Sequence, residues 1–129
     1  MHSPHDAGQA LRVTERDTER EAAGVRVVAV SGEADVESVA PLRALLEAAG
    51  TTADVLVLDL SGVRFADSSM VNVLVRAHTD IEERLRIAAP SAFVRRLFDL
   101  TCLNDVLAVH DSVADAEAHA RARALAPGE

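Results

Sequence analysis

The chain contains no lysine, so all 13 of its strongly basic residues are arginine. A phosphate-binding loop, a Schiff-base active site and a receiver-type aspartyl-phosphate site each depend on a lysine side chain. The sequence therefore disfavours these three kinds of site.

Aromatic residues and cysteine are also scarce. The chain has three Phe, no Tyr, no Trp and a single cysteine, Cys102. One cysteine cannot form an internal disulfide or a multi-cysteine metal site, and a reducing compartment permits it. Ala, Val and Leu supply most of the apolar residues, so we expect an aliphatic core with Cys102 as a buried thiol.

No apolar run approaches the ~20 residues of a membrane span, and the polar first ten residues lack the apolar block of a signal peptide. The net charge of −8 opposes binding to nucleic acid, which requires clustered cationic side chains. We therefore expect a cytoplasmic protein whose direct partner is neither a membrane nor a nucleic acid. Its Ala- and Arg-rich composition is typical of bacteria with GC-rich genomes.

A length of 129 residues suits one domain with a substantial core. We expect a disordered tail at 1–9, a single domain at 10–125 and a frayed end at 126–129. Within the domain, apolar patterning predicts strands near 11–13 and at 25–30, 54–60, 84–88 and 106–109. It predicts helices that end near 49, begin near 68, and span 91–101 and 112–125.

This alternation of strands and helices is typical of an α/β fold with a mostly parallel sheet. The passage between Thr79 and Arg84 is short for a helix-to-strand connection. It predicts either an early end of the preceding helix or a late start of the next strand. The first predicted helix, which ends near residue 49, accommodates Pro41 in its first turn and Gly50 at its end.

Three small polar residues, Asp67, Ser68 and Ser69, stand where a buried strand becomes a helix. Sites in parallel α/β sheets gather at such strand ends. Asp and Ser are also the preferred helix caps, because they satisfy amide groups that lack partners in the first turn. From these residues alone, plain capping and a chemically modifiable hydroxyl both remain open.

Residues 59–69 (DLSGVRFADSS) resemble the D-L-S-x-V-x-F-x-D-S-S signature of STAS domains, the family of the anti-sigma factor antagonists. Three further segments, 30–35 (VSGEAD), 89–100 (APSAFVRRLFDL) and 103–107 (LNDVL), are similar to other parts of the family pattern. The resemblance covers about residues 11–120. It implies a STAS (SpoIIAA-like) fold, a mostly parallel mixed sheet of about four or five strands covered by about four helices.

The resemblance also implies a function. In this family the serine directly after the aspartate is the phosphoacceptor, which corresponds to Ser68, while Ser69 is a cap or an alternative acceptor. The unphosphorylated protein would bind a serine-kinase-type anti-sigma factor and so regulate transcription, and a phosphatase would remove the phosphate. ATP and Mg²⁺ would belong to the kinase, so we expect no cofactor, no metal and no enzymatic activity in this chain.

The residues expected to face the partner are Asp67, Ser69, Met70, Asn72, Glu33 and Asp35. Met70 and Asn72 occupy positions where the family often has glycine, which would allow a partner backbone to approach closely. Met70 could instead turn inward as core. Asp35 or Ser38 could instead cap the first of the longer helices.

Other functions have weaker support. The histidines His78, His110 and His119 lack metal-ligand spacing and are expected to be exposed to solvent. Ser68 lacks the G-x-S-x-G elbow of a hydrolase nucleophile, so a small enzyme is disfavoured. The main alternative is a non-phosphorylated STAS scaffold or ligand-sensing subunit of a larger complex, such as a transporter.

Overall fold

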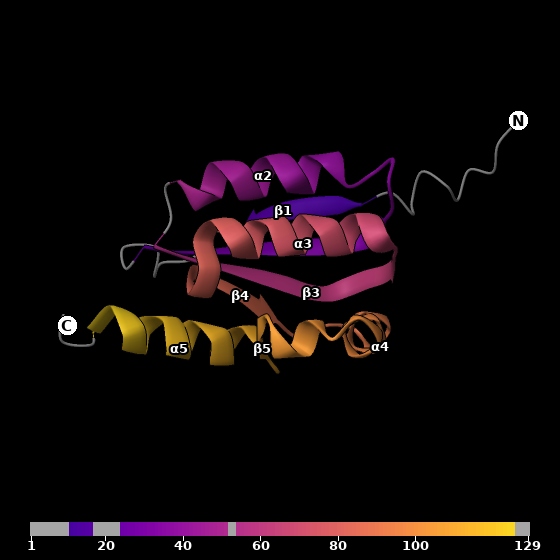
Figure 1. Ribbon diagram of the computed structural model, residues 1–129. Helices are drawn as coiled ribbons and strands as arrows, with labels where there is room; N and C mark the ends of the chain where they lie inside the picture. Colours follow the sequence, from indigo (N-terminus) through magenta and orange to yellow (C-terminus); the bar gives the residue numbers. More distant parts are fainter. Residues whose placement is uncertain (1–10, 17–23, 52–53, 126–129) are drawn as a thin grey trace, which may run out of the picture.

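The computed structural model describes residues 11–16, 24–51 and 54–125 (Figure 1). The predicted tail, the predicted frayed end and most of the connection before Gly24 lie outside the described residues. The strands are β1 (Arg12–Arg16), β2 (Val25–Ala34), β3 (Val55–Ala66), β4 (Leu85–Ala88) and β5 (Ala108–His110). The helices are α2 (Ala40–Gly50), α3 (Ser68–Ile81), α4 (Ala92–Thr101) and α5 (Val113–Leu125), with short 3₁₀ turns at Glu82–Arg84 and Leu103–Asp105.

The five strands form one sheet in the order β1-β2-β3-β4-β5. β1 is an antiparallel edge strand, and the other neighbouring pairs are parallel. Each parallel connection passes through a helix, as right-handed crossover units require. The predicted α/β class, with a mostly parallel mixed sheet and four helices, is confirmed over the described residues.

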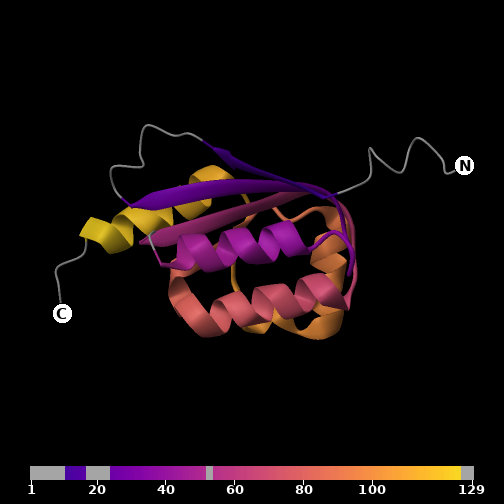
Figure 2. The ribbon, with the colours of Figure 1, turned by 90° about the horizontal axis from the view of Figure 1, so that it is seen from above.

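Helices cover both faces of the sheet, and each face has its own apolar core (Figures 1 and 2). The larger core packs the sheet against α2, α3 and α4 through side chains that include Leu42, Leu74 and Phe98. The smaller one packs it against Ala116 and Ala120 of α5. Residues 55–60 of β3 are all buried, because this part of the strand is covered on both faces.

β2 and β3 both run farther than the apolar pattern predicted. Beyond residue 60 only one face of β3 is buried: Val63 and Ala66 face the core, while the residues between them are exposed. Gly62 lies against β2 so closely that a Cβ there would stand 2.7 Å from the Cβ of Ser31. These extensions pair with each other and carry the ends of both strands beyond the rest of the sheet.

The connection after α3 agrees with one of the two predicted forms, the late start of the next strand. α3 continues to Ile81, and a 3₁₀ turn then leads directly into β4, which begins at Leu85, one residue later than expected. Glu82 makes this tight reversal by adopting a φ of 55°. The predicted burial of Cys102 is wrong, because Cys102 is exposed at the left-handed position that ends α4, with a φ of 62°.

Candidate functional site

The carboxyl end of β3 places the acidic and hydroxyl residues of the signature at the start of α3. Asp67 is the N-cap of this helix, and its Oδ1 accepts a hydrogen bond of 2.8 Å from the backbone N–H of Ser69. Asp67 therefore meets the capping requirement by itself. Neither serine hydroxyl is needed to begin the helix.

Ser68 is the first residue of α3, and its side chain is exposed. Among the residues that the structure describes, no hydrogen bond holds its hydroxyl oxygen. The positive end of the α3 dipole lies at this position and favours a bound negative charge. The Ser68 hydroxyl is thus accessible to another protein, while Ser69 is only half-exposed.

The end of β2 lies beside this helix start. Ala34 pairs with Ala66 in the sheet, and the backbone N–H of Asp67 donates to the carbonyl oxygen of Ala34 at 3.3 Å. Glu33 pairs with Phe65 one step earlier. The structure therefore brings Glu33 and the Asp67–Ser69 segment to the same edge of the sheet, as the parallel arrangement of the two strands predicted.

Asp35 belongs to a closed turn that follows β2. Its Oδ1 accepts hydrogen bonds from the backbone N–H groups of Glu37 (3.1 Å) and Ser38 (3.0 Å) and lies 2.9 Å from the Ser38 hydroxyl. The bond from the Ser38 side chain is the main cause of a lowered pKa of Asp35. The carboxylate is therefore both ionised at neutral pH and fixed in place. We call the edge of the sheet that carries Glu33, Asp35 and Asp67–Ser69 the rim.

The sequence had allowed Asp35 or Ser38 to cap α2, but neither residue does so. The N-cap position is Val39, which has no side-chain cap, and Pro41 stands in the first turn as predicted. The hydrogen bonds of Asp35 are satisfied within its own turn, a local arrangement that competes with capping. Asp35 is therefore partly exposed, and it belongs to the turn before α2 and not to the helix itself.

The predicted contact between Met70 and a partner is wrong for this structure, because the Met70 side chain is fully buried. It belongs to the inward face of α3 together with Val73, Leu74 and Ala77, which recur at helical spacing. The alternative that Met70 is core holds instead. Asn72, at the other family glycine position, is exposed.

Sequence reasoning missed an apolar part of this rim. The rings of Phe65 and Phe93 are paired, with centroids 5.5 Å apart, and the residues are 41% and 39% exposed. Ser91 fixes this arrangement: its hydroxyl donates to the carbonyl oxygen of Val63 at 2.7 Å and accepts from the N–H of Val94, capping α4. The signal in the sequence was Phe65 itself, which lies on the exposed face of β3 between Arg64 and Ala66.

A second missed cluster lies between β5 and α5. The rings of His110 and His119 have centroids 4.7 Å apart, and the buried Nε2 of His110 has no hydrogen-bond partner among the described residues. Burial, followed by the charges of His119 and Arg86, lowers the pKa of His110. His110 is therefore half-buried and not solvent-exposed as predicted, because its strand lies beneath α5.

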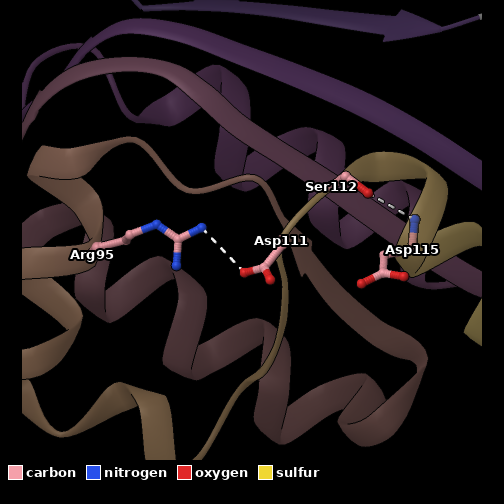
Figure 3. Close-up of polar contacts among 4 residues, drawn as sticks. All are labelled: Arg95, Asp111, Ser112 and Asp115. Carbon is pink, nitrogen blue, oxygen red and sulfur yellow. Dashed lines mark hydrogen bonds and ion pairs between the residues drawn. The ribbon is translucent and has the colours of Figure 1, made fainter.

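The segment between β5 and α5 is held at both ends (Figure 3). Asp111 forms an ion pair of 3.5 Å with Arg95 of α4, and the Ser112 hydroxyl accepts a hydrogen bond of 3.0 Å from the N–H of Asp115. Ser112 therefore caps α5 from just outside the helix, whereas the sequence had placed it as the first helical residue. The ion pair is exposed and contributes little to stability.

The STAS_2 family model, described as "Mlab, STAS domain", matches residues 18–109. The chain belongs to this STAS domain family. A crystal structure of an anti-sigma factor antagonist from Mycobacterium paratuberculosis shares 25% identity with it at a TM-score of 0.77, covering 94% of this chain and 99% of that one. No curated protein sequence matches the chain significantly.

Two further structures share the fold of this STAS domain. The Bacillus cell fate determinant SpoIIAA in its phosphorylated form matches at 20% identity and a TM-score of 0.61, covering 87% of this chain and all of that one (100%). Murine Slc26a9, an anion transporter, matches at 19% identity and a TM-score of 0.63, covering 88% of this chain and 22% of the transporter. The same fold thus occurs as a separate protein and as part of a transporter chain.

Two kinds of feature are absent from the described residues of this STAS domain. None of its described helices combines the length and apolar character that crossing a membrane requires. Within the same residues, no three His, Cys, Asp or Glu side chains are grouped in a way that could hold a metal ion.

Proposed function

We propose that this STAS domain is an anti-sigma factor antagonist, a binding protein that phosphorylation of Ser68 switches off. The observation that carries this proposal is the position of Ser68. Its hydroxyl is exposed and unbonded among the described residues, because Asp67 already caps the helix. Phosphorylation of Ser68 would therefore break no hydrogen bond among the described residues.

The physical effect of a phosphate differs between the free protein and a complex. In the free protein the group lies at the positive end of α3, an interaction worth about 0.3–1 kcal/mol when exposed, so the fold tolerates it. In a complex the same group adds about −1.5 to −2 charges under a surface that had closed over a neutral hydroxyl. The carboxylates of Asp67, Glu33 and Asp35 stand at the same rim and add to the repulsion.

The partner surface combines this polar centre with apolar neighbours. Phe65 and Phe93 offer partly exposed rings beside the start of α3, and Val36, 72% exposed, lies on the Asp35 turn. Aromatic anchors near an interface centre commonly carry much of the binding free energy. Together with Asn72 and Ser69, these residues form the face that we assign to the partner.

The partner is a serine-kinase-type anti-sigma factor in the cytoplasm. In its unphosphorylated form the STAS domain binds this factor, and the sigma factor is released to direct transcription. The kinase supplies ATP and Mg²⁺ in its own active site and transfers the terminal phosphoryl group to the Ser68 hydroxyl, leaving ADP. A separate phosphatase hydrolyses the phosphoserine and resets the switch, so this chain itself catalyses no reaction.

The test is incubation of the full chain with ATP, Mg²⁺ and a serine-kinase anti-sigma factor from the same organism, followed by mass spectrometry of the intact protein and its peptides. We expect one phosphate, on Ser68. Ser68→Ala should abolish it, while the matched variant Ser69→Ala should keep it. Modification of Ser69 alone, or none with an active kinase, would contradict the proposal.

A second function is favoured by the fold that this chain shares with part of the Slc26a9 anion transporter. In this form the STAS domain is a subunit of a larger complex, such as a transporter, and works without phosphorylation. Isolation of the tagged protein from native cells separates the two. Transporter subunits that co-purify equally with wild type, Ser68→Ala and Ser68→Asp would favour this second function.

A further inference from the structure

A groove of about 400 Å³ lies between α2 and α3, apart from the carboxylate rim described above. The two helices run side by side over the same face of the sheet (Figure 2). Leu46, Val73, Ala77 and Ile81 form the apolar floor of the groove, and each is only 5–7% exposed. The volume lies within the range of small-molecule pockets.

The rim of this groove is rich in arginine. Arg43 projects from α2, Arg76 from α3, and Arg84 from the turn that follows α3. Glu47 and Asp80 also line the groove. Three guanidinium groups around one cavity stand out in a chain whose net charge is −8.

Two of these arginines are not neutralised by the described residues. Arg43 has Glu47 four residues later on its own helix, and Arg76 has Asp80 in the same relation, yet neither arginine forms an ion pair with any residue that the structure describes. An arginine that precedes the acid is the weaker orientation for such a pair. Both guanidinium groups therefore keep unused hydrogen-bond donors over an apolar floor.

We propose that this groove binds a small amphipathic anion, with its carboxylate or phosphate head at Arg43 and Arg76 and its aliphatic body on the floor. Guanidinium groups bind planar carboxylate and phosphate oxygens through paired hydrogen bonds. None of the four floor side chains is aromatic, so the floor suits an aliphatic chain rather than a stacked ring. Arg84 also lines the groove, where arginines outnumber the carboxylates of Glu47 and Asp80.

The site is separate from Ser68 but shares a helix with it. Asn72 lines the groove one helical turn after Ser68. A ligand here would therefore contact the helix whose first residue is the proposed phosphoacceptor. The ligand site does not depend on phosphorylation, and its test requires neither a kinase nor a partner protein.

The experiment is a titration of the ¹⁵N-labelled full chain with four eight-carbon probes, octanoate, octyl phosphate, octanol and octylamine, and with acetate. We expect octanoate or octyl phosphate to shift the amide signals of α2 and α3 saturably, and the tighter of the two identifies the head group. Octanol and acetate should bind at least ~10-fold more weakly, because each lacks one half of the contact. Equal binding of octanol, tighter binding of octylamine, or no saturable shift would overturn the proposal.

Matched variants locate the head group. Arg43→Gln and Arg76→Gln remove the charge while keeping a side chain of similar shape, and each should weaken binding of the anion by about 10-fold. Arg96→Gln is the control, because Arg96 is exposed on α4 and does not line the groove. An equal loss in all three variants would assign the effect to overall charge and would contradict the site.

Discussion

Asp67 and Ser68 are adjacent small polar residues, but only Asp67 caps α3. Asp67 accepts the hydrogen bond from Ser69 that begins α3, and Ser68 keeps an exposed hydroxyl. A change at Ser68 should therefore alter partner binding without unfolding the helix. The same division explains why the short polar segment by itself could not distinguish a cap from a switch.

We expect Ser68→Ala to retain binding to the proposed anti-sigma factor partner, because the unphosphorylated surface is neutral at this position. Ser68→Asp should weaken binding at least ~10-fold, because it places a charge under the partner surface. Both variants should melt within a few degrees of the wild type, since an acidic residue in the first turn suits the helix dipole. Calorimetric titration and thermal melting measure these effects, and equal affinity of the two variants would rule out the switch.

Met70 and Asn72 make a second contrast within one helix. Met70 is fully buried in the larger core, whereas Asn72 is exposed. Met70→Ala should lower the free energy of unfolding by about 2–5 kcal/mol, because it leaves a cavity. Asn72→Ala should change it by no more than about 0.5 kcal/mol. Denaturant titration of both variants checks this, and a Met70 variant as stable as wild type would argue against the core position.

At the scale of elements, the order and type of strands and helices could be predicted from apolar periodicity. The strand ends could not. In residues 61–66 only every third position, Val63 and Ala66, is buried, so the segment lacks the alternation of a strand and resembles a loop after the continuous run of residues 55–60. Their strand geometry comes from pairing with the end of β2, where Gly62 approaches Ser31 closely, and a single sequence does not record that contact.

The extended part of β3 carries Phe65, whose partly exposed ring pairs with that of Phe93 on α4. Phe65→Ala or Phe93→Ala should weaken binding of the partner about 10-fold or more if the pair is an interface anchor. Each change should also lower the free energy of unfolding, by about 0.5–1.5 kcal/mol for the ring pair itself in addition to the loss of buried ring area.

Val106→Ala is the matched control for the ring pair, because Val106 is 48% exposed and lies after α4, outside the pair. Its affinity for the partner should equal that of wild type. A ring variant that loses stability but keeps its affinity would show that the pair serves the fold alone.

At the scale of the whole molecule, the larger core could be predicted from the sequence and the contacts beneath α5 could not. The larger core follows from aliphatic residues at helical and strand spacing. The smaller one, beneath α5, places His110 beside His119, a contact between a strand and a helix that neither segment indicates by itself. The groove between α2 and α3 could not be predicted from the sequence either, because Arg43 and Arg76 belong to different helices that become neighbours only in the folded chain.

The histidine cluster makes stability depend on pH. The groups that act on His110 are His119 and Asp115 of α5, Arg86 of β4 and Asp111 of the loop. Because the pKa of His110 in the folded state lies below its ordinary value of 6.5, the unfolded chain binds the proton more readily between these two values. The free energy of unfolding should therefore fall as the pH is lowered through 6.5, and level off below the folded pKa.

Urea unfolding at a series of pH values from 8 to 5 measures this dependence, and an NMR titration of the His110 ring gives the folded pKa. His110→Gln should flatten the slope, because the replacement does not titrate. His78→Gln, which changes a half-buried histidine on α3, should retain it. The pKa of Asp35 is lowered from 3.8, so its contribution persists down to more acidic pH and does not overlap this window. An unchanged slope in His110→Gln would show that another group binds the proton.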